Sequence, residues 1–422
     1  MSSFRFLHAA DLHLDSPLRG LGADAPAARI RQATRDALGN LVDLAIRERV
    51  DFMVVAGDLY DGDWQDFRTG QALVAAFARL TRAGIRVVAI RGNHDAESVL
   101  TRSLRLPDGA ALLRADRPDS LDWPELSVTL HGQSFGTRDV QQNLAQGYPA
   151  PLSNRFNIGL LHTAATGRPG HAAYAPCTVG QLAAHGYDYW ALGHIHAREE
   201  LLRNPWIVFP GNLQGRHVNE AGAKGASLVT VQHGRVAAVE HRAVDAVRWA
   251  RATVDCGGAA DEAAVLDRAR RAIGTAVDAA EGRLLALRLR LEGDCAAHDA
   301  LARDPAALRQ KLLSAMLEVA DADAVWLEDL RLATRPAGDD AGPLRLRDDA
   351  VGRLARAIDS LAEQPAAMPA VESYAATLLD RAGGLRQLLG PDHPAVRAAA
   401  GDLPPELLLR ARDLLLARLA QR

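Results

Sequence analysis

Apolar residues in the first 90 positions alternate between short continuous runs and segments with helical spacing. The run at 4–9 predicts a short strand, and the mostly apolar runs at 52–56 and 85–90 are typical of strands covered on both faces. Between them, 30–50 and 70–82 carry apolar residues at helical spacing. This β-α-β-α-β order predicts parallel strands joined by right-handed crossovers.

Strand-like segments dominate from residue 127 onward. We predict one helix over 179–185 and a hairpin turn at His233-Gly234. The predicted strands cover 127–131, 157–161, 189–192, 207–210, 227–232 and 236–242. A sandwich of two sheets with helices outside would accommodate this mixture.

A second unit begins near Val247, where strand and helix patterns alternate again. Strands are predicted over 249–255, 283–291 and 325–332, and helices over 263–276 and 305–319. Turn and breaker residues at 336–343 predict a linker, beyond which the chain is rich in Ala, Leu and Arg. The predicted α/β fold is therefore a β-sandwich flanked by helices (1–245), a small α+β domain (246–335) and a linker with a helical C-terminal region (336–422).

The composition is that of an ordinary globular protein, with 48% hydrophobic and 24% charged residues among 422. The net charge of -3 neither favours nor excludes a nucleic acid partner, because a local basic groove can exist in a neutral chain. Cys177, Cys256 and Cys295 are widely spaced, which fits free thiols in a reducing compartment. No signal-peptide pattern and no apolar run near the roughly 18 residues of a membrane span is present, so we expect a cytoplasmic protein.

Residue types that bind metals recur just after the apolar strands. Carboxyl ends of strands in α/β sheets converge on one crevice, so these distant positions can meet. In Asp-x-His and His-x-His, residues two apart point to one side of an extended segment. Glycines precede three of the candidates, where a close backbone approach would be needed. The candidate ligands are Asp11, His13, Asp58, Asn93, His162, His194 and His196.

This ligand set predicts two metal ions. Mixed carboxylate, imidazole and amide ligands suit Mn²⁺, Fe²⁺ or Zn²⁺ better than Mg²⁺. Seven ligands exceed one tetrahedral site but suffice for two ions that share a carboxylate. Two ions about 3.5–4 Å apart clamp the attacking and leaving oxygens of a phosphoryl displacement. Each motif alone could be a plain turn or a solvated strand edge; the metal centre rests on all five motifs occurring in order.

The five motifs resemble the calcineurin-like metallophosphoesterase superfamily over roughly residues 1–245. Three segments look most like the DNA-repair exonuclease subunits of the SbcD and YhaO-like type: 8–17 (HAADLHLDSP), 57–62 (GDLYDG) and 210–220 (PGNLQGRHVNE). Asp15 stands where the SbcD type usually has glycine, as in YhaO-like chains. The residues beyond 340 match nothing firmly.

The resemblance implies a role for each candidate residue. It places Asp11, His13, Asp58 and His196 on one metal, and Asp58, Asn93, His162 and His194 on the other, with Mn²⁺ as the usual family metal. His94 would be a non-ligand that protonates the leaving oxygen, with Asp95 orienting its ring. The family also pairs with an SMC-like ATPase through C-terminal helices, and its capping domain (246–335 here) would bind DNA.

Several other residues have two readings. Arg216 could bind phosphate, and His217 and Asn219 could approach the metals or the substrate, or this loop could bond mainly to its own backbone. Tyr60 and Trp64 could stack on a base or pack against the sheet. Asp61 could support a ligand or cap a helix, whereas His8 within a strand is expected in the core. Leucines on several faces of 404–419 fit either a partner helix or packing within the domain.

The leading hypothesis is a Mn²⁺-dependent DNA exonuclease or endonuclease acting in repair with an ATPase partner. One alternative is a phosphatase or cyclic-nucleotide phosphodiesterase with a small substrate, against which the additional domains argue. Another is a scaffold subunit that keeps its metals but contributes mainly to assembly. The oligomeric state stays open, and a homodimer is compatible with the sequence.

Overall fold

The computed structural model describes residues 3–16, 25–61, 67–96, 105–165, 174–337, 348–363, 368–381 and 393–401. Trp64, positions 338–343 of the predicted linker and the predicted helix over 404–419 lie outside these residues.

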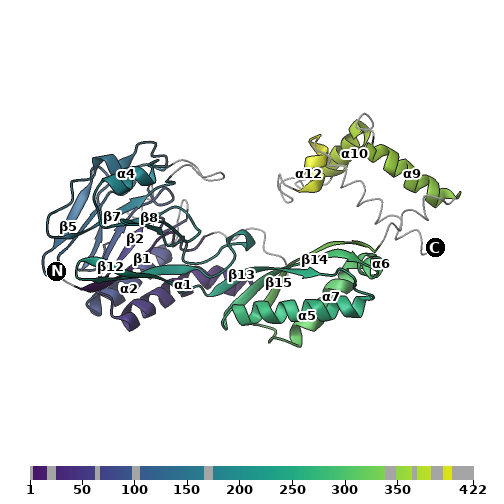
Figure 1. Cartoon of the computed structure of the whole chain (residues 1–422), viewed down its shortest axis with the longest axis horizontal. Helices are drawn as coiled ribbons and strands as arrows, with labels where there is room; N and C mark the ends of the chain where they lie inside the picture. The colour runs from purple at the N-terminus through teal and green to yellow at the C-terminus, as the bar shows by residue number, and fades with distance from the viewer. Residues whose placement is uncertain are drawn as a thin grey trace. The chain divides into compact units, whose positions relative to one another are not determined.

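A six-stranded mixed sheet forms the first layer of the N-terminal unit (Figure 1). Its strand order is β12-β11-β1-β2-β3-β4, with β1 to β4 mutually parallel and β11 antiparallel to β1. The predicted parallel pairing of the first three strands is confirmed. The bounds are β1 Phe4–Ala9, β2 Phe52–Ala56, β3 Arg86–Ile90, β4 Ala110–Leu112, β11 Gly225–Gln232 and β12 Arg235–Ala243.

A second six-stranded sheet forms the opposing layer, in the order β5-β6-β7-β8-β10-β9. Its four inner strands are parallel, and β5 and β9 pair antiparallel at the two edges. We did not predict β4, β5 or β9, which are short and only partly buried, so they lack a continuous apolar run. The bounds are β5 Asp119–Trp123, β6 Val128–Gly132, β7 Phe156–His162, β8 Tyr189–Gly193, β9 Glu199–Arg203 and β10 Trp206–Phe209.

Aromatic rings fill the space between the two sheets. Phe6 stacks on Phe52 at 5.0 Å between ring centroids, and its edge meets Tyr189 of the opposing sheet at 5.2 Å. Helices α1 (Ala27–Glu48) and α2 (Phe67–Arg82) cover the outer face of the first sheet, and α4 (Val179–Ala184) lies on the other side of the sandwich (Figure 1). The predicted β-sandwich with flanking helices is confirmed. Two short 3-10 helices, Leu144–Gly147 and Val218–Glu220, complete this unit.

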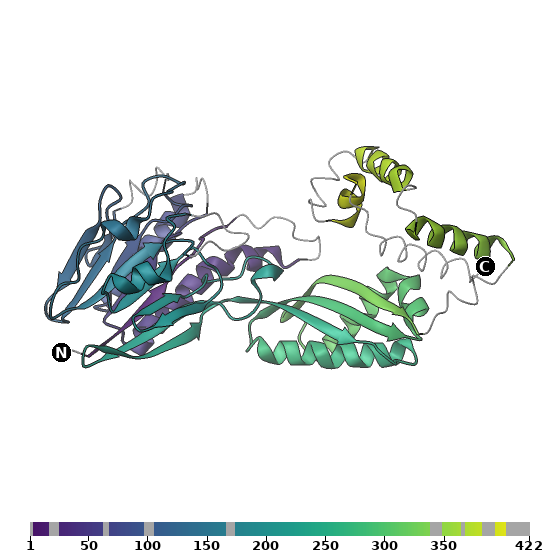
Figure 2. The same cartoon turned by 45° about the horizontal axis from the view of Figure 1, so that its top comes forward.

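The chain divides into two compact units, Met1–Ala250 with Ala280–Ala286, and Arg251–Ala279 with Leu287–Arg422. A three-stranded sheet has the order β13-β14-β15, and α5 runs along one of its faces (Figure 2). None of the described helices is long and apolar enough to cross a membrane. The bounds are β13 Val247–Asp255, α5 Glu262–Ala279, β14 Leu284–Cys295, α6 His298–Arg303, α7 Pro305–Leu317, β15 Val325–Pro336, α9 Ala350–Glu363, α10 Met368–Arg381 and α12 Pro394–Ala399.

Candidate metal centre

All seven predicted ligands stand at or just beyond the carboxyl ends of parallel strands. Asp11 and His13 follow β1, Asp58 follows β2, and Asn93 follows β3. The second sheet supplies the others: His162 ends β7, while His194 and His196 follow β8. The two layers of the sandwich therefore contribute to one site, as expected where parallel strands end at a common edge.

Four of these residues adopt the left-handed backbone region that non-glycine residues rarely occupy. The φ angles are 52° for Asp11, 41° for His13, 51° for Asp58 and 101° for His194. Such conformations cost of the order of 1–3 kcal/mol each and persist where the surrounding structure holds them. Close packing supplies that constraint: a side chain at Gly92 would overlap Asp58 and one at Gly193 would overlap the Ala56 carbonyl, as predicted for glycines before ligands.

The ligand atoms form overlapping groups within 4.8 Å of one another: Asp11 with His13 and His196, His13 with Asp58 and His94, and Asp58 with His162 and His194. Asp58 Oδ2 lies 3.7 Å from His13 Nε2 and 3.5 Å from His162 Nε2. Asp58 is thus placed between the two predicted metal positions. Asn93 joins the second, with Oδ1 3.0 Å from His162 Nε2.

The electrostatics of these groups fit a cationic occupant. Burial alone would lower the pKa of His162, but the Asp58 carboxylate outweighs it and raises the pKa to about 9, so positive charge is favoured here. His13 Nε2 and His196 Nε2 approach to 3.0 Å, a contact expected of two imidazoles that share one ion. The mixed nitrogen and oxygen donors are those of divalent Mn, Fe or Zn. The residues therefore fit a pair of divalent ions.

The carboxylate beside His94 is Asp61. Asp61 Oδ1 lies 2.8 Å from His94 Nδ1, and Ser16 and Arg216 also contact this carboxylate. Burial would lower the pKa of His94, but Asp61 and Asp58 raise it above its ordinary value. The predicted role of Asp95 as the orienting residue was wrong.

Asp95 serves the backbone of the two neighbouring loops instead. Fully buried, it accepts hydrogen bonds from the Gly92 amide at 2.6 Å and the Leu59 amide at 2.8 Å. Asp95 adjoins His94 along the chain, whereas Asp61 is adjacent to His94 only in space. The sequence therefore did not reveal the contact between Asp61 and the His94 ring.

A second carboxylate-imidazole pair joins Glu220 and His196. His196 Nδ1 lies 2.8 Å from Glu220 Oε1, and Arg216 Nη2 lies 3.1 Å from the same oxygen. Burial would raise the pKa of Glu220, but the hydrogen bond from His196 and the charge of Arg216 hold it below its ordinary value. Glu220 lies within the segment that resembles the nuclease subunits, yet we had not singled it out.

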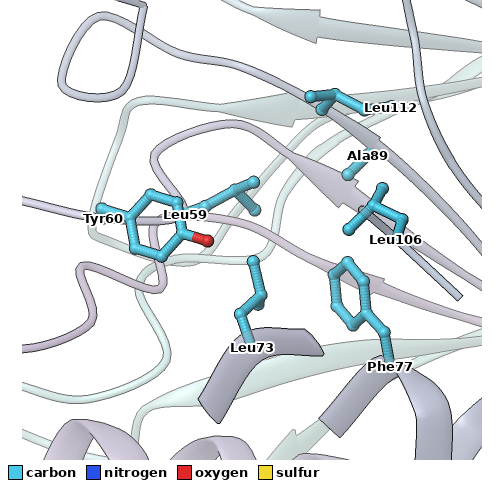
Figure 3. A pocket seen from close by; sticks show the side chains of 7 residues that line it. All are labelled: Leu59, Tyr60, Leu73, Phe77, Ala89, Leu106 and Leu112. Carbon is cyan, nitrogen blue, oxygen red and sulfur yellow. The ribbon is translucent and has the colours of Figure 1, made fainter. Parts of the chain in front are cut away.

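The predicted substrate-binding residues differ in their exposure. His217 and Asn219 are exposed beside the site, and the Asn219 amide donates to His217 Nδ1 at 3.2 Å. Tyr60 is fully buried and lines an apolar cavity of about 60 Å³ with Leu59, Leu73 and Phe77 (Figure 3). Stacking of Tyr60 on a base was therefore a wrong prediction, because its ring packs between the sheet and α2. Tyr174, which we did not single out, places its ring 5.4 Å from that of His194.

The loop that carries Arg216 and Glu220 is anchored at its other side to the start of β13. Gln214 Oε1 accepts the amides of Ala246 and Val247, and its Nε2 donates to the Val247 carbonyl at 2.7 Å. Trp249 Nε1 donates to the Gly215 carbonyl at 2.8 Å. Gln214 Nε2 also donates to the Gly215 carbonyl at 2.9 Å, so this side chain bonds to backbone groups of β13 and of its own loop.

His8 and the three cysteines take structural places. His8 is fully buried between the sheets, with Nδ1 3.0 Å from the Tyr189 hydroxyl and Nε2 3.1 Å from the Leu192 carbonyl. Burial lowers its pKa to about 3. Cys177, Cys256 and Cys295 are buried free thiols.

Two protein families match the chain. Residues 4–198 match the calcineurin-like phosphoesterases, and residues 249–335 match the middle domain of the metallophosphoesterase YhaO. The first segment contains all seven candidate ligands together with His94 and Asp61.

Curated relatives share the N-terminal part at moderate identity. The metallophosphoesterase YhaO of Bacillus subtilis is 36% identical over 261 residues, covering 60% of this chain and 64% of that protein. The DNA double-strand break repair protein Mre11 of Sulfurisphaera tokodaii is 25% identical over 243 residues, covering 54% of this chain and 60% of that protein. The chain thus spans less than two thirds of the length of either relative.

Among solved structures, a dimetal phosphatase from Danio rerio is similar to 55% of this chain over 94% of its own, with a TM-score of 0.37 and 15% identity. The match of residues 249–335 to the YhaO middle domain agrees with the similarity of the chain to the Bacillus subtilis YhaO protein. The chain therefore carries a calcineurin-like metallophosphoesterase domain and is YhaO-like, with homology to the Mre11 and SbcD proteins.

Proposed function

We propose that this protein is a two-metal phosphodiesterase that hydrolyses DNA. The observation that carries the proposal is the clustering of the candidate ligands into overlapping groups, two of which share Asp58, with His94 beside them. Mn²⁺ is the proposed metal, held by Asp11, His13, Asp58 and His196 in one position and by Asp58, Asn93, His162 and His194 in the other.

The metal ions, when bound, would polarise the phosphoryl group and lower the pKa of an attacking water. The residues of the chain act around that chemistry. Asp61 holds the Nδ1 side of His94, which leaves Nε2 as the nitrogen that can protonate the leaving oxygen. The His94 side chain is 28% exposed, whereas His13 and His162 are almost wholly buried, so a substrate can reach His94. Proton transfer of this kind typically raises the reaction rate 10²–10⁴-fold.

The remaining parts of the proposal concern the substrate and the partner. The homology to Mre11 and SbcD supports DNA over a small phosphate ester. Exposed His217 and Asn219 could contact the strand at the edge of the site. We further propose the three-part division at 245 and 335, with the middle part binding DNA and the C-terminal part binding an SMC-like ATPase in the cytoplasm.

The test is nuclease activity with added Mn²⁺ on single- and double-stranded DNA, with bis(p-nitrophenyl) phosphate assayed alongside. Wild type is compared with Asp58→Asn, which removes a charge from both metal positions, and with His94→Ser, which removes the proton donor. We expect DNA cleavage by wild type and a loss of at least about 10²-fold in each variant.

Other outcomes would redirect the proposal. Hydrolysis of the small diester without DNA cleavage would keep the metal centre and reject DNA as the substrate of the isolated chain. Mn²⁺ binding without hydrolysis of either substrate would favour an assembly role. DNA cleavage that persists in both variants would reject the proposed site.

A further inference from the structure

We propose that Glu220 and Arg216 form a brace that holds His196 in its metal-binding tautomer, so that they set the affinity of one metal position and not the other. The inference rests on the metal centre of the proposed function but not on the identity of the substrate. It makes Glu220 and Arg216 positioning residues, and Arg216 is then not the free phosphate anchor that its loop suggested.

The hydrogen bonds decide where the proton of His196 lies. Glu220 Oε1 is 2.8 Å from His196 Nδ1, and an ionised carboxylate can only accept. Nδ1 therefore carries the hydrogen, because two lone pairs at that distance would repel. Arg216 Nη2 lies 3.1 Å from both Nδ1 and Glu220 Oε1, and with Nδ1 protonated it donates to the carboxylate. Nε2 is left with its lone pair directed towards His13 Nε2, 3.0 Å away, on the side of the ligand cluster. A carboxylate that fixes the tautomer of a ligating histidine in this way also raises its basicity.

Glu220 is itself held from several directions. Asn212 Nδ2 and the Arg216 amide each donate to Oε2 at 2.8 Å, and Arg216 Nη2 donates to Oε1 at 3.1 Å. The side chain is only 9% exposed. Charge-assisted hydrogen bonds of this kind are the stronger class, and together they leave the carboxylate one orientation.

Arg216 connects this pair to the other functional histidine. Its Nη1 lies 3.3 Å from Asp61 Oδ2, and Asp61 in turn contacts His94. The guanidinium, 17% exposed, therefore spans the two carboxylates that orient His196 and His94. A planar fork suits this double contact, and lysine, with a single point charge, cannot reproduce it.

The brace acts on one side of the metal centre. His196 groups with Asp11 and His13, whereas the second group of Asp58, His162 and His194 contains no partner of Glu220. The backbone of His196 is fixed separately, since its carbonyl accepts Lys224 Nζ at 2.8 Å and the Asn212 amide at 3.2 Å. Loss of the Glu220 carboxylate should therefore free the ring while the loop stays in place.

The experiment measures metal binding to the full chain after chelation, by calorimetric titration with Mn²⁺ and by the visible absorption of bound Co²⁺. Glu220→Gln keeps the size of the side chain but removes its charge. Of the two binding steps, we expect one to weaken 10–100-fold and the other to change less than about threefold. Arg216→Lys should weaken the same step by a smaller factor. Glu328→Gln, which removes the carboxylate of a similar Arg288 ion pair on β15, is the matched control and should change neither step.

A second readout tests the tautomer directly. Nitrogen-15 chemical shifts of the His196 ring in the metal-free protein should report hydrogen on Nδ1 in wild type and a mixture of tautomers in Glu220→Gln. Circular dichroism at increasing temperature checks that each variant is folded. Equal weakening of both steps, or unchanged affinity with an unchanged tautomer in a folded variant, would overturn the proposal. A failure to cleave DNA would leave these measurements intact, so the two proposals fail separately.

Discussion

Two carboxylate-imidazole pairs stand on either side of Arg216 at the same short separation. In one, Asp61 lies 2.8 Å from Nδ1 of His94; in the other, Glu220 lies 2.8 Å from Nδ1 of His196. The remaining nitrogen distinguishes them. Both rings stand edge-on to His13 at 4.9 Å between centroids. However, Nε2 of His196 lies 3.0 Å from Nε2 of His13, another candidate ligand, whereas the His94 side chain is the more exposed of the two, at 28% against 20%. A carboxylate partner therefore does not by itself assign a histidine to metal binding or to proton transfer.

The most direct test of the difference between the two pairs is to replace each imidazole in turn. His94→Gln should lower the rate of diester hydrolysis by about 10²–10⁴-fold while metal content stays at the wild-type value. His196→Gln should lower the rate at least as far and also reduce the metal bound per chain. Rates with bis(p-nitrophenyl) phosphate and elemental analysis of the purified protein give the two numbers.

An equal loss of bound metal in His94→Gln and His196→Gln would contradict the assignment of one histidine to proton transfer and the other to metal binding. His217→Gln is the control, because His217 is an exposed histidine in the same neighbourhood that is not placed among the ligand groups. Its metal content should match that of wild type.

A smaller effect should follow from crowding the loop that carries His194 and His196. A methyl group at Gly193 would overlap the Ala56 carbonyl of β2, so Gly193→Ala should cost about 1–3 kcal/mol of unfolding free energy. Gly39→Ala, at an open position within α1, should instead stabilise by about 0.5–1 kcal/mol. Urea unfolding of the metal-free proteins measures both changes. The absence of destabilisation in Gly193→Ala would contradict the packing of this loop, and destabilisation by Gly39→Ala would contradict the open position in α1.

A pH-dependent effect comes from His8, an imidazole whose two contacts are neutral oxygens. Because burial lowers the pKa of His8 to about 3, the unfolded chain binds more protons than the folded one between pH 6.5 and 3. Stability from this group is complete above pH 6.5 and falls as the pH drops, by about 2 kcal/mol at pH 5. The difference in unfolding free energy between pH 7 and pH 5 should therefore shrink in His8→Asn. His233→Asn, in the exposed turn after β11, should leave it unchanged, and an equal difference in wild type and His8→Asn would refute the assignment.

The sequence predicted which candidate ligands lie close together because their pattern is tied to local structure. A buried strand followed by Asp, Asn or His marks a strand end, and parallel strand ends meet. The sandwich with flanking helices followed from the same periodicity. Edge strands such as Asp119–Trp123 carry alternating polar residues and half-exposed faces, so they gave too little apolar signal.

The sequence did not predict the contacts that one loop makes with another. Asp61 and Asp95 both adjoin the site, and only the path of the loop after β2 brings Asp61 to the His94 ring. The burial of Tyr60 depends on the packing of α2 against the sheet, which residue spacing does not encode. Glu220 reaches His196 across 24 residues of chain, so no local pattern announced it.

The anchoring of the Gln214-Gly215 segment to Val247 and Trp249 has a consequence for exchange between relatives. The strand that leads into the second unit and the loop that orients His196 share hydrogen bonds, so they must vary together. A chimera that takes β13 and everything after it from another member of the family would carry a strand fitted to a different loop. Such a graft should include residues 211–222 from the same donor if the recipient is to keep its metals.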